Sequence, residues 1–347
     1  MNSLNDMLTP EDALRLNVLL AGELLAVRID EGARLLYGLT PKGEAKMPLN
    51  PVGRIDRYFQ RVRELLGGHA LGSPGGYPVH LRRWTRMGHA EPRKLEALLK
   101  LGEPEAVLAV AYAPALTDEL ARRAWWATQN TVATMEVARV MLACPAVRHG
   151  TMGQVLADFL VEHLPFEEDP VAAMQTVRAV LAAGLLSPAA REPLWLKGKR
   201  RPHYLIGFLE SLPDELPPEA PRAVPDSIPE SVLNTPSGQL LARCYSGVGQ
   251  SYLHVAELVL EKPLAHEMVY RMLDLLGQHF AAGRHASADF PQLPAEAAAL
   301  EALSRLSQSD AEPILTRTTA VGSLMRRHLE PLLAPIIGQL RVLRGIS

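Results

Sequence analysis

Met152-Gly153-Gln154-Val155-Leu156-Ala157-Asp158-Phe159-Leu160-Val161-Glu162-His163 is the stretch that decides the fold class of this chain. Its apolar side chains recur at spacings of three and four residues, which is the pattern of a helix that buries one face. Comparable short stripes occur on both sides of it, at 95–99, 107–111, 120–127, 132–142 and 171–181, and proline or glycine separates most of them. The sequence therefore predicts a mainly α fold in which helical hairpins stack in the manner of HEAT repeats.

A region near the N-terminus departs from this helical pattern. Thr9-Pro10 is a typical helix start, and the helix it opens is expected to run to about Gly22. Apolar and polar side chains then alternate over 24–31, 34–39 and 44–47, with turn residues between these runs. We expect a small antiparallel β meander here, followed by a helix over 54–66 that Gly67-Gly68 ends.

The segment between Leu212 and Gly238 contains seven prolines. Because proline lacks an N–H and fixes φ, neither a helix nor a central strand is expected there. We predict a linker, or a strap that crosses the surface. The expected organisation is an α+β domain over 1–70, a helical-repeat domain over 71–212, the proline-rich segment over 213–238 and a helical domain over 239–347. The last two helices are expected over 318–329 and 331–343.

Composition limits the class of protein. The 36 basic and 38 acidic residues give a formal net charge of -2, which argues against a chain-wide attraction for nucleic acid but leaves room for a local basic patch. No apolar run is long enough for a transmembrane helix, and the N-terminus lacks the features of a signal peptide. Cys144 and Cys244 form no CxxC motif and are expected to be reduced. We expect a cytoplasmic protein with no membrane association.

A glycine-rich loop, Gly72-Ser73-Pro74-Gly75-Gly76, precedes the arginines Arg82, Arg83 and Arg86. It lacks the lysine of a phosphate-binding P-loop and the frame of a nucleophile elbow. The glycines suit a turn with positive φ. The alternative is an anion site in which Gly72, Ser73, Gly75 and Gly76 lie near the three guanidinium groups.

The densest positive charge is Lys197-Gly198-Lys199-Arg200-Arg201. Such a run is typical of a solvated loop. It also suits phosphate contact, with Lys197, Lys199, Arg200 and Arg201 as the cations and the neighbouring Trp195 and Tyr204 stacking on unpaired bases. Both interpretations stay open at this point.

No pattern predicts catalysis or metal binding. The chain has 11 histidines but no HExxH motif. The acidic run Glu167-Glu168-Asp169 directly precedes Pro170, where a helix is expected to begin, so capping explains it. We expect no metal, no cofactor and no catalytic residue.

Several segments together resemble the DsrS proteins of sulfur-oxidising bacteria. These segments lie in the first two thirds of the chain and are Leu14–Leu20, Leu71–Val79, Leu81–Gly88, Leu101–Val107 and Leu116–Trp126. The resemblance implies a cytoplasmic accessory or regulatory protein encoded with the reverse-acting dissimilatory sulfite reductase, which oxidises stored sulfur. It implies no catalytic residues, because the family has none established.

The sequence is therefore compatible with three functions. The first is a non-enzymatic accessory or regulatory protein of sulfur oxidation that acts by binding protein partners of that pathway. The second is an RNA-binding post-transcriptional regulator that uses the 197–203 loop. The third is a binder of sulfur oxyanions or other small anions, or an enzyme acting on them, at the 72–86 segment, where arginine forks suit oxyanions. The oligomeric state is left open.

Overall fold

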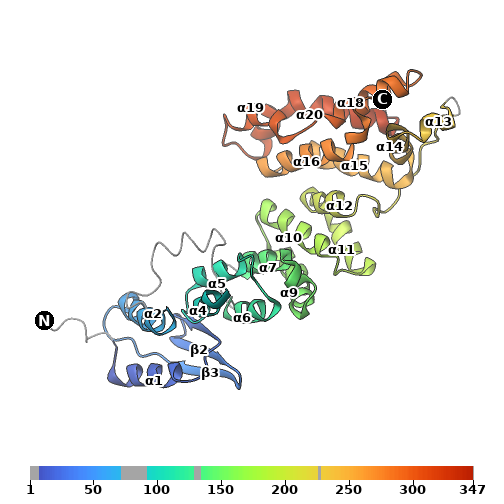
Figure 1. The fold of residues 1–347 in the computed structure, drawn as a ribbon. Helices are drawn as coiled ribbons and strands as arrows, with labels where there is room; N and C mark the ends of the chain where they lie inside the picture. The colour runs from blue at the N-terminus through green and yellow to red at the C-terminus, as the bar shows by residue number, and fades with distance from the viewer. Residues whose placement is uncertain (1–7, 72–91, 129–133, 226–227, 347) are drawn as a thin grey trace. The chain divides into compact units, whose positions relative to one another are not determined.

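The computed structural model of the chain describes residues 8–71, 92–128, 134–225 and 228–346 (Figure 1). These residues divide into two compact units, one ending at Leu160 and the other beginning at Val161. Helices dominate both units, and the described residues contain one three-stranded antiparallel sheet near the N-terminus. The predicted fold class, mainly α with a small N-terminal β meander, is confirmed.

The sheet of the first unit has the strand order β1-β2-β3, with β1 at Ala26–Asp30, β2 at Leu35–Thr40 and β3 at Gly43–Pro48. Its inner face packs against α1 (Pro10–Leu20) and α2 (Ile55–Leu71), where Leu16, Leu36 and Phe59 are buried. A Cβ atom at Gly38 would lie 3.2 Å from Leu19 Cδ1. Glycine at this position in β2 therefore lets α1 approach the sheet closely.

A buried carboxylate joins the elements of this small core. Asp12 on α1 has no exposed surface. Its oxygens accept hydrogen bonds from the backbone N and the Nδ2 of Asn50, both at 3.1 Å, and from the Tyr58 hydroxyl at 2.7 Å. Asn50 follows β3 and Tyr58 belongs to α2, so one side chain links α1 to both segments. These bonds compensate the cost of burying a charge.

The remaining helices of the first unit follow one another in short steps. They are α4 (Pro92–Leu98), α5 (Pro104–Ala111), α6 (Asp118–Thr128), α7 (Thr134–Ala143), α8 (Pro145–Arg148) and the start of α9 (Thr151–His163). Neighbours in sequence contact each other from α4 through α8, and α6 also contacts β1. The backbone N–H of Val27 donates to the carbonyl oxygen of Leu99 at 2.8 Å, so the segment after α4 covers part of the β1 edge.

The second unit contains the end of α9 and a larger set of helices. These are η1 (Leu164–Phe166), α10 (Pro170–Ala183), α11 (Pro188–Gly198), η2 (Pro202–Tyr204), α12 (Leu205–Ser211), α13 (Glu230–Leu233), α14 (Pro236–Tyr245), α15 (Gly247–Glu261), α16 (His266–His279), η3 (Ala281–Gly283), α17 (Ala286–Asp289), α18 (Pro294–Ser304), η4 (Gln308–Asp310), α19 (Glu312–Leu315) and α20 (Gly322–Arg344). The last helix, α20, contacts α14, α15 and α18. Contacts in this unit therefore extend beyond the sequential neighbours of a simple helical stack.

Three helix boundaries differ from the sequence-based expectation. α2 continues through Gly67-Gly68 to Leu71, although a helical glycine costs about 1 kcal/mol, and Gly67 is buried in the helix. α20 is one helix that contains Pro331 and Pro335, because Leu329, Leu333 and Ile336 continue its buried stripe past both prolines. The proline-rich segment includes α13, and α14 begins within it at Pro236, a favourable first helical position.

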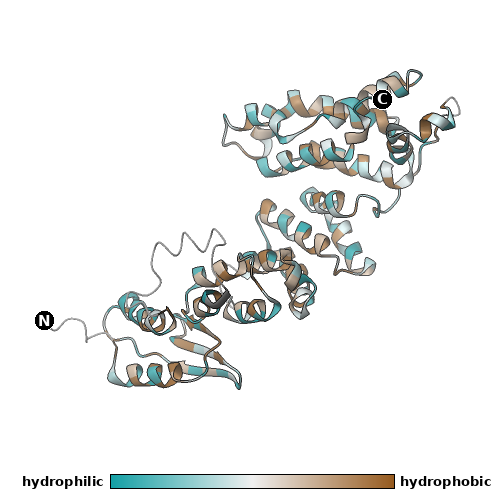
Figure 2. Ribbon diagram, in the orientation of Figure 1, coloured by the Kyte–Doolittle hydropathy of each residue, from teal (hydrophilic) through white to brown (hydrophobic). Residues whose placement is uncertain are grey.

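The part of the proline-rich segment before α13 crosses the surface of the second unit. Leu216 is buried there, and the backbone N–H groups of Glu219 and Arg222 donate to the carbonyl oxygens of Gly247 at 2.9 Å and Tyr245 at 2.8 Å. Most helices show both hydrophilic and hydrophobic colours along their length, as amphipathic helices do (Figure 2). No helix in the described ranges is long and apolar enough to cross a bilayer.

Candidate functional site

The basic run lies at the C-terminal end of α11. Ser187 caps the start of this helix by accepting the N–H of Ala190, and Gly198 is its last residue. A Cβ atom at Gly198 would lie 2.4 Å from Leu205 Cδ2, so glycine lets the end of α11 approach the start of α12. The N–H groups of Arg200 and Arg201 donate to the carbonyl oxygen of Lys197 at 3.0 Å. This tight turn holds the basic residues at one corner of the second unit.

We call Lys197, Lys199, Arg200 and Arg201 the cationic corner. All four side chains are exposed, and none forms a salt bridge with a carboxylate of the described chain. Eight other arginines in the described part of the same unit do form such ion pairs, namely Arg178, Arg191, Arg222, Arg243, Arg271, Arg305, Arg341 and Arg344, whereas the isolated exposed Arg284 and Arg317 form none there. Positive charge at a helix C-terminus is favourable. The charge of the corner nevertheless remains available to an external anion.

The two aromatic rings beside the corner are part of the core. Trp195 is 8% exposed and contacts Phe208 edge-on, with ring centroids 5.3 Å apart. Tyr204 has no exposed surface, and its hydroxyl donates to the carbonyl oxygen of Leu164 at 3.4 Å. The idea that these rings stack on unpaired bases therefore fails, because neither face is open to a base. The exposed apolar neighbour of the cations is Leu196, at 54% exposure.

A buried histidine lies under the corner. His203 is 6% exposed, and its Nδ1 atom has no hydrogen-bond partner in the described structure. Burial, together with the charge of Arg201, lowers the pKa of His203 to about 4. The imidazole is therefore neutral near pH 7 and adds no charge to the cationic corner.

The other sequence-predicted site is not placed by the structure. Gly72, Ser73, Gly75, Gly76, Arg82, Arg83 and Arg86 all lie outside the described residues. Whether the arginines converge on the glycine-rich loop stays a prediction.

Two buried or partly buried carboxylates of the second unit join helices. Glu210 on α12 pairs with Arg178 on α10 and Arg271 on α16, and hydrogen bonds from both arginines lower its pKa against the opposing effect of burial. Glu257 on α15 pairs with Arg341 and Arg344 on α20, and its pKa is lowered in the same way. These carboxylates are ionised and paired. Neither has the raised pKa expected of a general acid at neutral pH.

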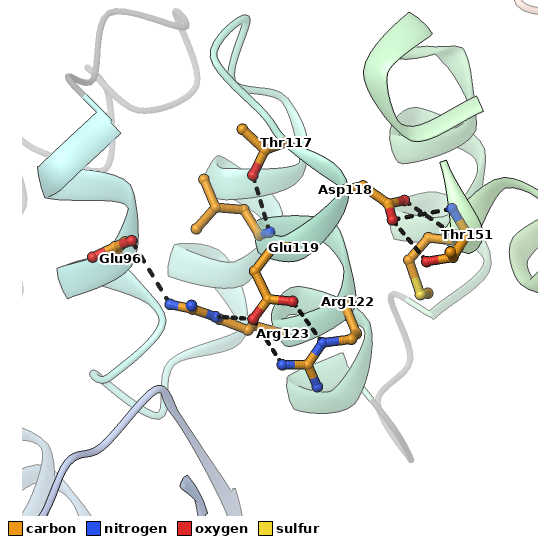
Figure 3. Close-up of polar contacts among 9 residues, drawn as sticks. Glu96, Thr117, Asp118, Glu119, Arg122, Arg123 and Thr151 are labelled. Carbon is orange, nitrogen blue, oxygen red and sulfur yellow. Dashed lines mark hydrogen bonds and ion pairs between the residues drawn. The ribbon is translucent and has the colours of Figure 1, made fainter. Parts of the chain in front are cut away.

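A polar cluster in the first unit has a similar structural role (Figure 3). Asp118 accepts hydrogen bonds from the N–H groups of Thr151 and Met152, both at 3.0 Å, so it caps the start of α9. Hydrogen bonds from Arg122 and Arg123 lower the pKa of Glu119 to about 2. The helix cap and the ion pairs account for every labelled side chain in this view, and they leave no spare nucleophile or base.

Buried thiol, phenol and imidazole groups also meet between α14, α15 and α16. Tyr252 stacks on His279 with ring centroids 3.7 Å apart, and burial lowers the pKa of His279 to about 3. Burial raises the pKa of the Cys244 thiol to about 12. A thiolate is the reactive form of cysteine, so this thiol is inert at neutral pH.

A row of cationic and aromatic side chains on the outer face of the sheet was not predicted from the sequence. Arg28, Tyr37 and Lys46 are cross-strand neighbours on the outer face of the sheet, and the Arg28 guanidinium lies 4.4 Å from the centre of the Tyr37 ring. Trp126 on α6 donates from Nε1 to Glu44 at 3.0 Å. The alternating strand pattern could have revealed this row, because residues at every second position share a face. The hydrogen bond between Trp126 and Glu44 joins α6 to this face of the sheet.

The described residues contain no group of three or more His, Cys, Asp or Glu side chains arranged to hold a metal ion. Among the grooves lined by described residues, two are of moderate size. One of about 350 Å³ lies between α15 and α20, and one of about 450 Å³ lies between α1 and β3. No protein-family model, curated protein or solved structure matches the chain.

Proposed function

We propose that this protein is a non-enzymatic binding protein whose cationic corner docks an acidic surface of a protein partner. The observation that carries the proposal is the set of four exposed cations at the end of α11, none of which is neutralised within the described chain. Complementary charge across an interface speeds association and selects the partner. The resemblance to the DsrS proteins suggests that the partner belongs to the sulfur-oxidation pathway, in the cytoplasm.

A protein partner is favoured over RNA by the surroundings of the corner. The buried rings of Trp195 and Tyr204 offer no stacking platform, so RNA would be held by phosphate contacts alone. Leu196, in contrast, places an exposed apolar side chain directly before the cations in α11. An apolar centre with a charged rim is the usual composition of a protein interface.

RNA remains the second candidate, because four cations in five residues suit sequence-independent phosphate contact. The third function, small-anion binding at 72–86, depends on residues outside the described ranges, so no contact or distance in the structure supports it.

The proposal is tested by a photocrosslinking amino acid placed at Leu196 in the native host cell. Leu324, with 51% exposure against 54% for Leu196, gives a matched control position in the same unit. We expect crosslinks from position 196 that protease removes and nuclease does not, and that are absent at position 324. Adducts removed by nuclease would select the RNA candidate. An absence of crosslinks at 196 beyond those at 324 would refute the cationic corner as a docking site.

A further inference from the structure

β3 forms one edge of the sheet, and its hydrogen-bonding pattern can be read from the strand register. The N–H of Leu49 donates to the carbonyl oxygen of Arg34 at 2.9 Å, so this pair is a hydrogen-bonded pair. Hydrogen-bonded pairs alternate along an antiparallel ladder, so Leu36–Met47 and Gly38–Ala45 are also of this kind. The N–H and C=O groups of Glu44 and Lys46 consequently point away from β2.

These outward groups have no backbone partner within residues 8–71, 92–128, 134–225 and 228–346. Pro48 occupies the next outward position, where its missing N–H costs no bond within the sheet. The opposite edge differs, because Val27 of β1 already donates to Leu99. An edge with unpaired groups of this kind is a template for an additional strand.

An apolar groove runs beside this edge. It has a volume of about 450 Å³ and is lined by α1 residues, including Leu14 and Val18, and by β3 residues, including Ala45 and Met47. Leu14 and Val18 are 64% and 67% exposed, which is unusual for two large apolar side chains one helical turn apart. The unpaired edge and the apolar helix face therefore lie on the same side of the first unit.

We propose that β3 pairs antiparallel with β3 of a second copy of this chain, and that a two-fold axis passes at Ala45. This register places Glu44 directly opposite Lys46 of the second copy, and Lys46 opposite its Glu44. Both are hydrogen-bonded pairs, so their outward N–H and C=O groups satisfy each other. Directly opposite residues share one face of a sheet, so each carboxylate meets an ammonium group.

The same register brings the two α1 helices together. Both stand on the inner face of the joined six-stranded sheet, over β2 and β3. With strands about 4.8 Å apart, their axes lie roughly 10 Å from each other, the distance at which helices pack. Leu14 and Val18 of one copy then cover those of the other. One interface thus accounts for the open edge, the paired charges and the exposed helix face, and it has the self-complementary form of a two-fold dimer.

Charged residues on an edge strand can also serve to prevent pairing. A single sign of charge would repel a second copy in any register. Glu44 and Lys46 instead carry opposite signs two residues apart, an arrangement that an antiparallel copy complements. The two explanations differ in the oligomeric state that they predict.

The test is sedimentation velocity of the full chain between about 1 and 100 μM, a range in which a dimer with micromolar Kd becomes the main species. We expect the wild type to be dimeric at the upper end. Glu44→Lys and Lys46→Glu each place like charges opposite one another and are expected to weaken the dimer about tenfold or more. Glu44→Lys also removes the acceptor of Trp126 and the partner of Arg28, so circular dichroism checks that each variant stays folded. An equimolar mixture of these two variants restores both opposite-charge pairs, so native mass spectrometry is expected to find the mixed dimer.

Lys46→Pro provides a second variant that tests the backbone pairing, because it removes the outward N–H together with the Lys46 charge. It removes an outward N–H that the sheet of a single copy does not use, so it is expected to abolish the dimer and to keep the thermal stability of the monomer. Ala45→Pro removes an inward N–H and is expected to unfold the meander instead. A wild type that stays monomeric up to 100 μM overturns the proposal. A dimer that resists all the position-44 and position-46 changes overturns it equally.

Discussion

The Nη1 atom of Arg222 donates to the backbone carbonyl oxygen of Val342 at 3.0 Å, so the proline-rich strap is joined to the last turns of α20. The Nη2 atom of Arg222 pairs with Glu296 on α18 at 2.9 Å, and its guanidinium lies 4.6 Å from the centre of the Tyr245 ring. One side chain thus holds the strap against three helices. Residues 212–225 of the proline-rich segment form neither helix nor strand, and such contacts order them.

We expect Arg222→Ala to lower the free energy of unfolding of the second unit by about 2 kcal/mol, because it leaves the mostly buried Glu296 without its cation. Urea denaturation at pH 7 measures this change. Arg284→Ala, which removes an exposed arginine of the same unit, is the control and is expected to have almost no effect. If Arg222→Ala is as neutral as Arg284→Ala, the strap is not held by this side chain.

Asp12 provides a corresponding test in the first unit. Asp12→Ala leaves three donors of Asn50 and Tyr58 without their acceptor and is expected to cost about 3 kcal/mol. Tyr58→Phe removes only one of these bonds and is expected to cost about 1 kcal/mol. Chemical denaturation followed by circular dichroism gives both values, with the exposed Glu23→Ala as control. Equal losses for Asp12→Ala and Tyr58→Phe would show that Asp12 is not a shared acceptor.

The stability of the second unit is expected to fall as the pH decreases from about 6.5 to about 4. The pKa of His203 is about 4 in the folded protein, against the ordinary value of 6.5. Between these values the unfolded chain binds a proton that the folded chain does not, so acid favours unfolding with a slope of up to about 1.4 kcal/mol per pH unit. Above pH 6.5 both states hold a neutral imidazole, and this contribution is constant.

His203→Phe is therefore expected to reduce this pH dependence. His279, with a pKa of about 3, acts in the same direction and stays in place as an internal reference. The measurement is the free energy of unfolding of both proteins at pH 7, 6 and 5. Identical slopes for the two proteins would mean that His203 titrates normally in the folded state.

Local signals in the sequence identified helix starts with good accuracy. Thr9 caps α1 by accepting the N–H of Asp12, and Asp169 caps α10 by accepting the N–H groups of Val171 and Ala172, as its place before Pro170 predicted. The three strands also lie where the alternating pattern placed them. These features depend on residues a few positions apart, so a single sequence contains the information.

Features that depend on distant partners could not be predicted. Trp195 and Tyr204 flank a basic run, and nothing local distinguishes a core ring from an exposed one; contacts with Phe208 and Leu164 decide it. The continuity of α20 through Pro331 likewise follows from a buried stripe packed against α15 and α18. The cationic corner was found because its four cations lie within five consecutive residues. The β3 edge was missed because it needs the register of three strands.

Affinity capture from native host extract with a charge-reversed corner tests whether the cationic corner docks a protein partner. Lys197→Glu, Lys199→Glu and Arg200→Glu are combined, and Arg201 is kept because it donates to Tyr204. Lys262→Glu, Arg284→Glu and Arg317→Glu make the same change in net charge at exposed positions elsewhere in the same unit. We expect the corner variant to lose an acidic protein partner that the wild type and the control both retain after nuclease treatment. Retention of every captured protein by the corner variant would contradict it.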